Sequence, residues 1–322
     1  MNGTTYDAAD TARPADNKEK TFAGKLRMEI KNCGALYVMA LPVVLYYILF
    51  RYIPMFGTVM AFQKFNIAKG IFGSPWVGLD NFVTFFNSYY FFRLLRNTFL
   101  ISATDLLFNF PAPIIFALLL NEVNTKWFKK TVQTISYMPY FVSIVVLCGL
   151  VIDFCQAGGV ISNIASVLLG EQVNLMSRPE YFRAIFVGSN IWQGLGYGSI
   201  VYIAALTGVD QELYEAAVID GAGRWKQTLH ITIPSIMPTI TILLILRMGS
   251  ILDVGYEKVM LLYNPATYET ADVISTFVYR KGFVDYDYSY STAVGLFNSV
   301  INLALLTLTN YISRRAGEIS LF

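Results

Sequence analysis

The sequence predicts an all-α polytopic membrane protein with about six transmembrane helices. Of its 322 residues, 55% are hydrophobic and only 14% are charged, and the mean hydropathy is +0.49. Soluble domains carry about 25% charged residues, so this chain has too little charge to cover the surface of a water-soluble protein of its length. The 24 Phe and 21 Tyr exclude a disordered chain. A net charge of +2 argues against a strongly basic nucleic-acid-binding protein.

Apolar stretches long enough to cross a bilayer, which takes about 20 helical residues, recur along the whole chain. We expect spans at residues 35–56, 97–121, 132–155, 183–207, 234–254 and 291–312. Several contain proline, which membrane helices tolerate because neighbouring groups satisfy the freed backbone carbonyls. The intervening segments 57–96 and 255–290 are rich in aromatic and turn residues, and we expect them to form ordered loops outside the membrane.

The polar residues 1–34 are expected to form a cytoplasmic arm, and residues 316–322 a short cytoplasmic tail. In the arm, Phe22, Leu26 and Ile30 recur every four residues beside lysines, which suits a short helix in the inner membrane interface. A solvated arm is the alternative. With both termini inside, the inner segments hold 13 Lys and Arg in 80 positions, and the outer segments hold 8 in 103. Basic residues concentrate on the cytoplasmic side, so the count favours this orientation.

Cysteine and histidine are too few for a disulfide framework or a metal centre. The three cysteines, Cys33, Cys148 and Cys155, have no paired CxxC spacing, and His230 is the one histidine in the sequence. We therefore expect neither a metal site nor a catalytic triad.

The most informative segment lies between the fourth and fifth spans, at residues 208–233. The expected helix starts with the acidic residues Asp210 and Glu212, which suit the positive end of a helix dipole. Good helix formers follow, and Gly221 and Gly223 permit a left-handed stop. Pro234 then opens the next span. The pattern predicts a helix, a turn and a second short helix. Together they would form a compact protrusion that a partner protein could bind.

This loop resembles the EAA motif of type I ABC importer permeases, and we call it the coupling loop. The resemblance rests on Glu-Ala-Ala, three residues, Gly, and about nine residues to Ile-x-Ile-Pro; Leu229 stands where an aromatic residue is common. In that family the loop is a coupling helix that docks in a groove of the ATP-hydrolysing subunit. The resemblance implies that the ATPase-coupling residues of this chain are Glu215, Ala216, Ala217, Asp220, Gly221 and Ala222.

The resemblance covers most of residues 35–315, which are expected to form a type I ABC importer transmembrane domain. Residues 42–57, 73–82 and 110–122 are similar to permeases of the branch that handles complex oligosaccharides and polysaccharides. The resemblance implies a permease of the bacterial cytoplasmic (inner) membrane that works by alternating access. Its partners would be a second permease in a heterodimer, two ATP-binding cassette ATPase subunits and an extracytoplasmic solute-binding protein.

The sequence contains no GxxxxGK[ST] loop to cradle nucleotide phosphates. We therefore expect that the chain is not an enzyme, binds no cofactor itself, and relies on ATP and Mg used by the partner ATPase subunits. Its other contacts would be the oligo- or polysaccharide substrate and membrane lipid, with no nucleic acid.

Polar groups within the spans are costly and mark candidate positions on a substrate path. The fourth span combines amides, aromatic rings and glycines, which suits a sugar with its hydroxyls and flat apolar face. Packing and interhelical hydrogen bonds explain the same residues equally well. The candidates are Asn190, Trp192, Gln193, Tyr197, Arg247, Asp253, Asn298 and Asn302.

Arg247 and Asp253 fall in the same predicted helix, where a separation of six residues places them about 240° apart, so we expect no direct pair. Each could instead pair with another helix or with the second permease. If the cargo is an acidic sugar such as a uronate chain, Arg247 would clamp its carboxylate.

A charged and tyrosine-rich stretch in the last outer segment predicts a docking surface for the solute-binding protein. Its charged members are Arg280, Lys281, Asp285 and Asp287. An aromatic belt at the membrane surface is the alternative.

Two other functional classes remain open at this level. An ion-coupled secondary sugar transporter would use intramembrane carboxylates, and Asp105 and Asp153 are its support. A non-transporting membrane scaffold would keep the spans but need no polar path.

Overall fold

The computed structural model describes residues 22–315, and for residues 22–33 the backbone alone. Residues 22–315 are all-α, with an isolated bridge between Gln63 and Trp76 as their sole β pairing. The chain divides into two compact units, residues 1–57 and 58–322. The predicted tail at 316–322 and most of the predicted arm lie outside the described residues. The prediction of an interfacial helix remains a prediction.

In the first unit a helical path runs from residue 22 to residue 55. It consists of α1 (Phe22–Tyr47), the π-helical η1 (Ile48–Tyr52) and α2 (Ile53–Met55). Pro42 lies inside α1 and Pro54 inside α2. The predicted arm and the first span are therefore joined by continuous helix, without a break at residue 34.

The helices before the coupling loop are η2 (Phe56–Phe62), α3 (Gly70–Gly73), α4 (Asp80–Phe86), α5 (Phe91–Asn109), α6 (Pro111–Glu122), α7 (Lys126–Tyr137), η3 (Met138–Phe141), α8 (Ile144–Cys155), α9 (Val160–Leu169), η4 (Leu175–Ser177), η5 (Pro179–Tyr181) and α10 (Phe182–Thr207). Those from the coupling loop onward are α11 (Gln211–Ile219), α12 (Arg224–Gln227), η6 (Thr228–Thr232), α13 (Ile233–Met248), α14 (Tyr256–Leu262), α15 (Tyr268–Ala271), α16 (Ile274–Tyr279), η7 (Arg280–Val284) and α17 (Tyr288–Arg315).

Within residues 22–315, five helical segments are long and apolar enough to cross a membrane. They are Gly34–Phe62, Phe91–Glu122, Ile144–Leu169, Arg224–Met248 and Tyr288–Arg315. The predicted fourth span corresponds to α10, which has 26 residues and lies outside this set. Its amides and glycines lower its hydropathy, although at 1.5 Å per residue its length of roughly 39 Å exceeds that of a bilayer core.

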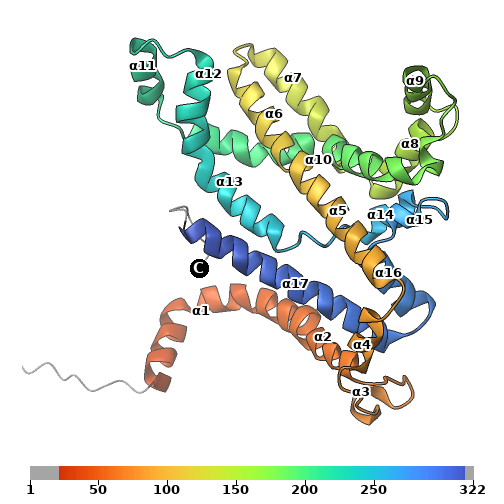
Figure 1. The fold of residues 1–322 in the computed structure, drawn as a ribbon. Coiled ribbons are helices and arrows are strands. Elements are labelled where there is room, and N and C mark those ends of the chain that lie inside the picture. The colour runs from red at the N-terminus through yellow and green to blue at the C-terminus, as the bar shows by residue number, and fades with distance from the viewer. Residues whose placement is uncertain (1–21, 316–322) are drawn as a thin grey trace, which may run out of the picture. The chain divides into compact units, whose positions relative to one another are not determined.

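The second unit is built around two crossing helical rods (Figure 1). One consists of α5 and α6, which follow each other with Phe110 between them and Pro111 at the start of α6. The other is α10, which packs along both of them. A core cluster that includes Ile101, Leu147, Phe186 and Val259 joins α5, α8, α10 and α14. These contacts fix the positions of side chains in the middle of α5 and α10.

The predicted third span at 132–155 is broken in the structure, which corrects the expectation of one continuous helix. The break runs from η3 to Ser143, and α8 begins after it. Pro139 lies in η3, and Ser143 caps α8 by accepting a hydrogen bond from the N–H of Val146 at 3.4 Å. Proline lacks a backbone donor, and a serine cap favours a new helix start. The apolar segment here runs from Ile144 to Leu169.

The predicted fifth span is also shorter at its end, because α13 ends at Met248. Asp253 therefore does not share a helix with Arg247, and the helical-wheel comparison of these two residues does not apply. In the last outer segment, predicted as a loop, the short helices α14, α15 and α16 form instead.

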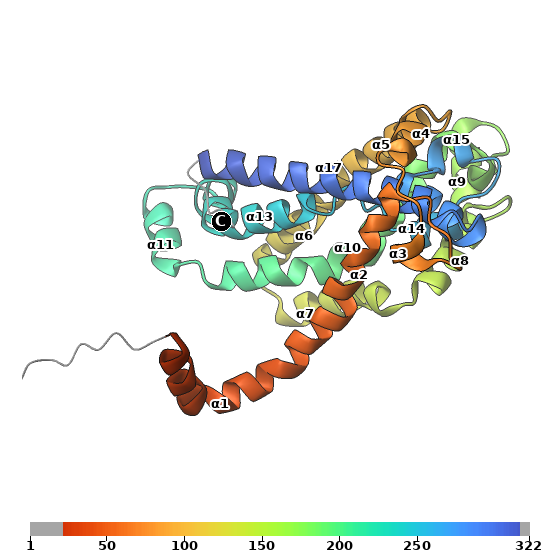
Figure 2. The same cartoon turned by 90° about the horizontal axis from the view of Figure 1, so that it is seen from below.

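The coupling loop and the short helices α14–α16 lie at opposite ends of the second unit. α11 and α12 lie at one end in both views, and α8, α9, α14 and α15 lie at the other (Figures 1 and 2). The C-terminal end of α17 lies at the same end as α11. The coupling loop and the surface formed by α14–α16 are therefore separated by the length of the helical rods.

Candidate functional site

The coupling loop is a capped helix followed by a glycine turn, as its sequence predicts. The Asp210 carboxylate caps α11 by accepting a hydrogen bond from the N–H of Glu212 at 3.0 Å. At the other end Gly221 has φ +72°, a left-handed conformation that favours glycine. The Gly221 N–H donates to the carbonyl of Val218 at 3.0 Å, and the Ala222 N–H donates to that of Ala217 at 2.8 Å. This pair of bonds is a Schellman motif.

The coupling loop is held together by internal hydrogen bonds and is joined to α6 by one exposed ion pair. The hydroxyls of Tyr214 and Thr232 lie 2.9 Å apart, and the Gln227 amide donates to the carbonyl of Ala222 at 2.8 Å. Arg224 forms an exposed ion pair of 3.6 Å with Glu122 at the end of α6. The Tyr214–Thr232 contact connects α11 to the residue before α13, and the Arg224–Glu122 pair connects α12 to α6.

The outer face of the coupling loop is unusually apolar for an exposed turn. Ile219 is 86% exposed and Trp225 is 75% exposed, and Val218 lies beside them in the chain. Glu215, Val218 and Ile219 line a shallow groove together with Gln211 and Tyr214. Exposed apolar side chains gathered with charged ones are typical of a protein interaction surface.

A second feature is a polar cavity of about 350 Å³ between α5, α10, α13 and α14, which we call the central cavity. Asp105 on its wall lies 14 residues into α5, or roughly 20 Å from the helix start, which is deep within a membrane span. The lining residues are Ile101, Ser102, Asp105, Asn109, Tyr140, Ile144, Phe186, Asn190, Gln193, Gly194, Arg247, Ile251, Asp253, Val254, Gly255 and Lys258. Of the eight predicted path residues, Asn190, Gln193, Arg247 and Asp253 meet here.

Asp105 is the centre of the hydrogen-bond network in this cavity. Its side chain is 4% exposed, and the Arg247 guanidinium approaches to 2.5 Å. Asn190 donates to the other carboxylate oxygen at 2.8 Å, and Asn109 lies at 3.3 Å from it. A buried carboxylate needs such donors to offset its lost hydration. The ion pair with another helix that the sequence left open for Arg247 is thus present.

Lys258 completes the network from α14, outside the five spanning segments. Its ammonium donates to Asn190 Oδ1 at 2.6 Å and to Gln193 Oε1 at 3.4 Å. It also lies 5.8 Å from the centroid of the Phe186 ring. The residue is 4% exposed. Burial disfavours the charged ammonium and lowers the pKa of Lys258 to about 8, an effect that the nearby Asp105 partly offsets.

Asp253 lies on the cavity wall in the segment that follows α13. Asn298 donates to its carboxylate at 3.1 Å, and Asn302 lies at 3.4 Å from the same oxygen. Asn302 also accepts the N–H of Leu252 at 3.1 Å. These two asparagines of α17 therefore hold the chain after α13 in place and contact the cavity through Asp253.

The structure does not bring the two aromatic candidates of α10 to the cavity wall. Trp192 lines a separate, mostly apolar cavity of about 460 Å³ beside Phe154 and Ile161. Tyr197 stacks on Tyr140 with ring centroids 3.7 Å apart, and Tyr140 in turn lines the central cavity. Tyr197 therefore contacts a residue of the cavity wall but does not line the cavity itself.

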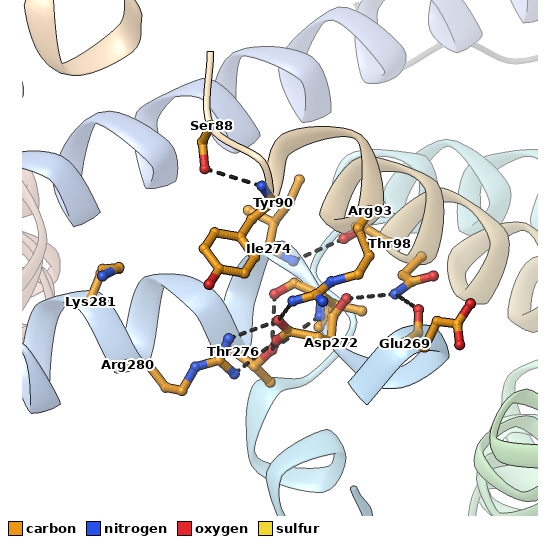
Figure 3. Close-up of polar contacts among 12 residues, drawn as sticks. Ser88, Tyr90, Arg93, Thr98, Glu269, Asp272, Ile274, Thr276, Arg280 and Lys281 are labelled. Atoms are coloured by element: carbon orange, nitrogen blue, oxygen red, sulfur yellow. Dashed lines mark hydrogen bonds and ion pairs between the residues drawn. The ribbon is translucent and has the colours of Figure 1, made fainter. Parts of the chain in front are cut away.

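The predicted docking residues at the other end of the second unit have different roles in the structure (Figure 3). Arg280 grips the fully buried Asp272 through two hydrogen bonds of 2.8 Å, and Arg93 approaches the same carboxylate at 3.3 Å. Burial lowers the pKa of Arg280, but the hydrogen bonds and charge of Asp272 outweigh it and raise that pKa overall. We call Asp272, Arg93 and Arg280 the outer arginine cluster.

The remaining docking candidates lie next to this cluster. Lys281 and Asp285 form an exposed ion pair of 2.7 Å. Asp287 caps α17 by accepting a hydrogen bond from the N–H of Tyr290 at 3.1 Å. Lys281 and Asp285 thus present charge at the surface, while Arg280 and Asp287 hold the fold together.

Sequence reasoning missed Lys258, and it did not place Asp105 on the substrate path. Lys258 lies in a segment read as an outer loop, where a lysine is unremarkable. Asp105 was noted as an intramembrane carboxylate, but no local pattern pairs it with Arg247, 142 residues away. A charge at membrane depth was the available signal for Asp105, and Lys258 had none.

Comparison with known proteins agrees with this architecture. Residues 109–318 match the family model described as "Binding-protein-dependent transport system inner membrane component". The chain is 45% identical over 294 residues to Protein LplB of Bacillus subtilis, covering 91% of this chain and 92% of that protein. It is 43% identical over 315 residues to the polygalacturonan/rhamnogalacturonan transport system permease protein YteP of the same organism, covering 98% of each.

A solved structure also matches over nearly the whole chain. It is that of a bacterial alginate ABC transporter in complex with an alginate pentasaccharide-bound periplasmic protein. The matching chain is 44% identical, with a TM-score of 0.85, and the match covers 92% of this chain and 100% of that one.

Proposed function

The chain belongs to the family of binding-protein-dependent transport system inner membrane components, and from this premise we propose that it is the transmembrane permease subunit of an ABC importer for acidic oligo- or polysaccharide. The proposal has three parts, which concern the coupling to ATP hydrolysis, the orientation in the membrane and the cargo. The coupling loop is the observation that carries it.

The first part assigns the coupling loop to a partner ATPase. The exposed face formed by Val218, Ile219 and Trp225, with Glu215 beside it, has the apolar and charged character of a docking surface. Ala216 and Ala217 allow close approach, and Gly221 with Asp220 and Ala222 holds the turn that ends α11. ATP and Mg would be used by two ATPase subunits, and this chain would supply no catalytic group.

Movement of the coupling loop would then drive alternating access. The contacts of Tyr214 with Thr232 and of Arg224 with Glu122 connect the loop to α13 and α6. α13 carries Arg247, and α6 continues α5, which carries Asp105. When the ATPases close on ATP, the loop would move inward and these helices would open the path to the outside. Hydrolysis would reset them.

The second part places both termini in the cytoplasm of a bacterial cell. Lysine and arginine are about twice as dense in the segments that this orientation places inside. The C-terminal end of α17 also lies at the same end as α11 (Figure 1). The opposite end would receive an extracytoplasmic solute-binding protein, with Lys281 and Asp285 as its charged contacts, and a second permease would complete the path.

The third part concerns the cargo. The central cavity offers amide groups of Asn190 and Gln193 for sugar hydroxyls, and Arg247 and Lys258 as cations. YteP is named for polygalacturonan and rhamnogalacturonan, and the matching solved transporter for alginate. Arg247 is paired with Asp105, so Lys258 is the cation of this wall without a carboxylate partner among residues 22–315, and an ammonium suits sugars that carry carboxylates.

Reversing the charge of Glu215 tests the proposed function. We expect Glu215→Lys to abolish the stimulation of ATPase activity by the sugar-loaded binding protein in the reconstituted complex, because the repelled loop no longer docks. Membrane insertion should stay unchanged. Glu180→Lys is an equal charge change on an exposed residue of η5, at the opposite end of the unit. It should keep the basal ATPase rate of the complex, and the affinity for the binding protein is measured for both variants so that a docking defect is recognised. Equal stimulation in wild type and Glu215→Lys would refute the coupling assignment.

A further inference from the structure

The charges that line the central cavity are unequally neutralised. Arg247 pairs with Asp105 at 2.5 Å, whereas Asp253 accepts hydrogen bonds from two neutral amides of α17 and has no cationic partner among residues 22–315. Lys258 forms no ion pair with a carboxylate within residues 22–315, and its hydrogen-bond partners are the neutral oxygens of Asn190 and Gln193.

A buried ammonium without a carboxylate partner is costly, and proteins keep such groups paired or use them. Lys258 is 4% exposed as a residue, yet it lines an open cavity. An ammonium has three N–H donors, and the two amide oxygens take at most two of them. One N–H donor of the ammonium is therefore available to a ligand in the cavity.

The neighbours of Lys258 fix its position. Asn190 accepts from Lys258 and donates to Asp105, so the lysine is tied through one amide to the Asp105–Arg247 pair. Phe186 lies against the ammonium at 5.8 Å and is itself part of the cavity wall, where it offers an apolar face. A cation beside an apolar ring and an amide suits a uronate, which has a carboxylate, hydroxyls and an apolar ring face.

We propose that Lys258, with Asn190 and Gln193, forms a carboxylate-binding subsite that makes the central cavity selective for uronate sugars. The inference rests on the proposed function, which supplies the saccharide cargo. Arg247 has a different role in this proposal. Its guanidinium pairs with Asp105, and its side chain lines the cavity wall. The subsite predicts selectivity within the membrane path itself, in addition to any that the solute-binding protein provides.

The test measures binding to the assembled complex of both permeases and the ATPases in nanodiscs, without the solute-binding protein. The probes are fluorescent tetragalacturonate and its fully methyl-esterified form, which keeps the hydroxyls and removes the charges. Lys258→Met should weaken tetragalacturonate binding roughly tenfold or more, the size expected for a hydrogen bond to a charged group. Binding of the ester should stay within about twofold of wild type.

Two further variants separate charge from structure. Lys258→Cys should lose tetragalacturonate binding and regain it after modification with 2-aminoethyl methanethiosulfonate, which restores an ammonium. The neutral methyl methanethiosulfonate should not restore it, and wild type treated with both reagents is the control for the native cysteines. Lys69→Met removes an exposed lysine far along the chain from α14 and should bind both probes as wild type does.

Three outcomes would overturn the proposal. Unchanged tetragalacturonate binding in Lys258→Met refutes the subsite alone and leaves the proposed function intact. If Lys258→Met weakens the binding of both probes equally, Lys258 has a structural role and does not recognise the carboxylates. A wild-type complex that binds the ester at least as tightly as the acid refutes the acidic cargo and the subsite together.

Discussion

The Arg247 guanidinium and the Asp105 carboxylate, 142 residues apart in the chain, lie 2.5 Å from each other on the wall of the central cavity. The pair joins α13 to α5, so it connects the helix that follows the coupling loop with the first helix of the α5–α6 rod. Its environment is asymmetric. The Asp105 side chain is 4% exposed, and that of Arg247 is 42% exposed, so the carboxylate depends on the pair more than the guanidinium does.

Removing the charge of Asp105 should therefore lower the free energy of unfolding by less than breaking a fully buried ion pair would. Breaking a buried pair costs about 3–5 kcal/mol. Because water reaches Arg247, we expect about 2 kcal/mol for Asp105→Asn, seen as a lower melting temperature of the complex in detergent. The double variant Asp105→Asn, Arg247→Gln should recover part of this loss. Additive losses in the double-mutant cycle would show that the two side chains do not interact.

The outer arginine cluster provides a second stability test. Asp272 is fully buried and accepts from Arg280, Arg93 and Thr276, so Asp272→Asn should leave two guanidinium groups without their anion. We expect a loss of about 3 kcal/mol in unfolding free energy. The matched control is Asp285→Asn, which breaks the exposed pair with Lys281 and should cost at most about 0.5 kcal/mol. Equal losses in the two variants would contradict a structural role for the cluster.

The glycine turn of the coupling loop contains its own control. Gly221 has φ +72°, so Gly221→Ala should strain the turn by about 1–2 kcal/mol and reduce the binding-protein-stimulated ATPase rate. Gly223 has φ −68° and open space where a Cβ would lie, so Gly223→Ala should be close to wild type. Both rates are measured in the reconstituted complex. A Gly221→Ala complex with normal stimulation would show that the Schellman turn is not needed for coupling.

Binding of acidic saccharide should depend on pH through Lys258. With a pKa of about 8, the ammonium is charged at pH 7 and loses its proton as the pH rises past 8. Affinity for tetragalacturonate should fall by up to about tenfold per pH unit above that value. Lys258→Arg, which stays charged, should remove the dependence. It retains Asp105, Cys148, Arg247 and Asp253, the other ionisable groups near the ammonium, so a dependence that persists in it would come from them.

Local sequence signals predicted the coupling loop well and the cavity only in part. The N-cap of α11 depends on Asp210 and Glu212, and its C-cap on residues from Ala217 to Ala222, so each cap is set by neighbours in the sequence. The helix break before α8 depends on local residues too, but Pro139 in an apolar stretch was compatible with a continuous membrane helix. The end of α13 was misplaced by several residues because the apolar run continues beyond Met248.

The sequence by itself determined the membrane class, the approximate spans and the turn at Gly221, because hydropathy and backbone preference act over a few neighbouring residues. Only the tertiary structure decided which polar groups meet. Lys258 reaches Asn190 across 68 residues and Arg247 reaches Asp105 across 142, and these distances close through helix packing. The chemistry of the central cavity is therefore a property of the packed helices, because Arg247 and Lys258 meet their hydrogen-bond partners only through tertiary contacts.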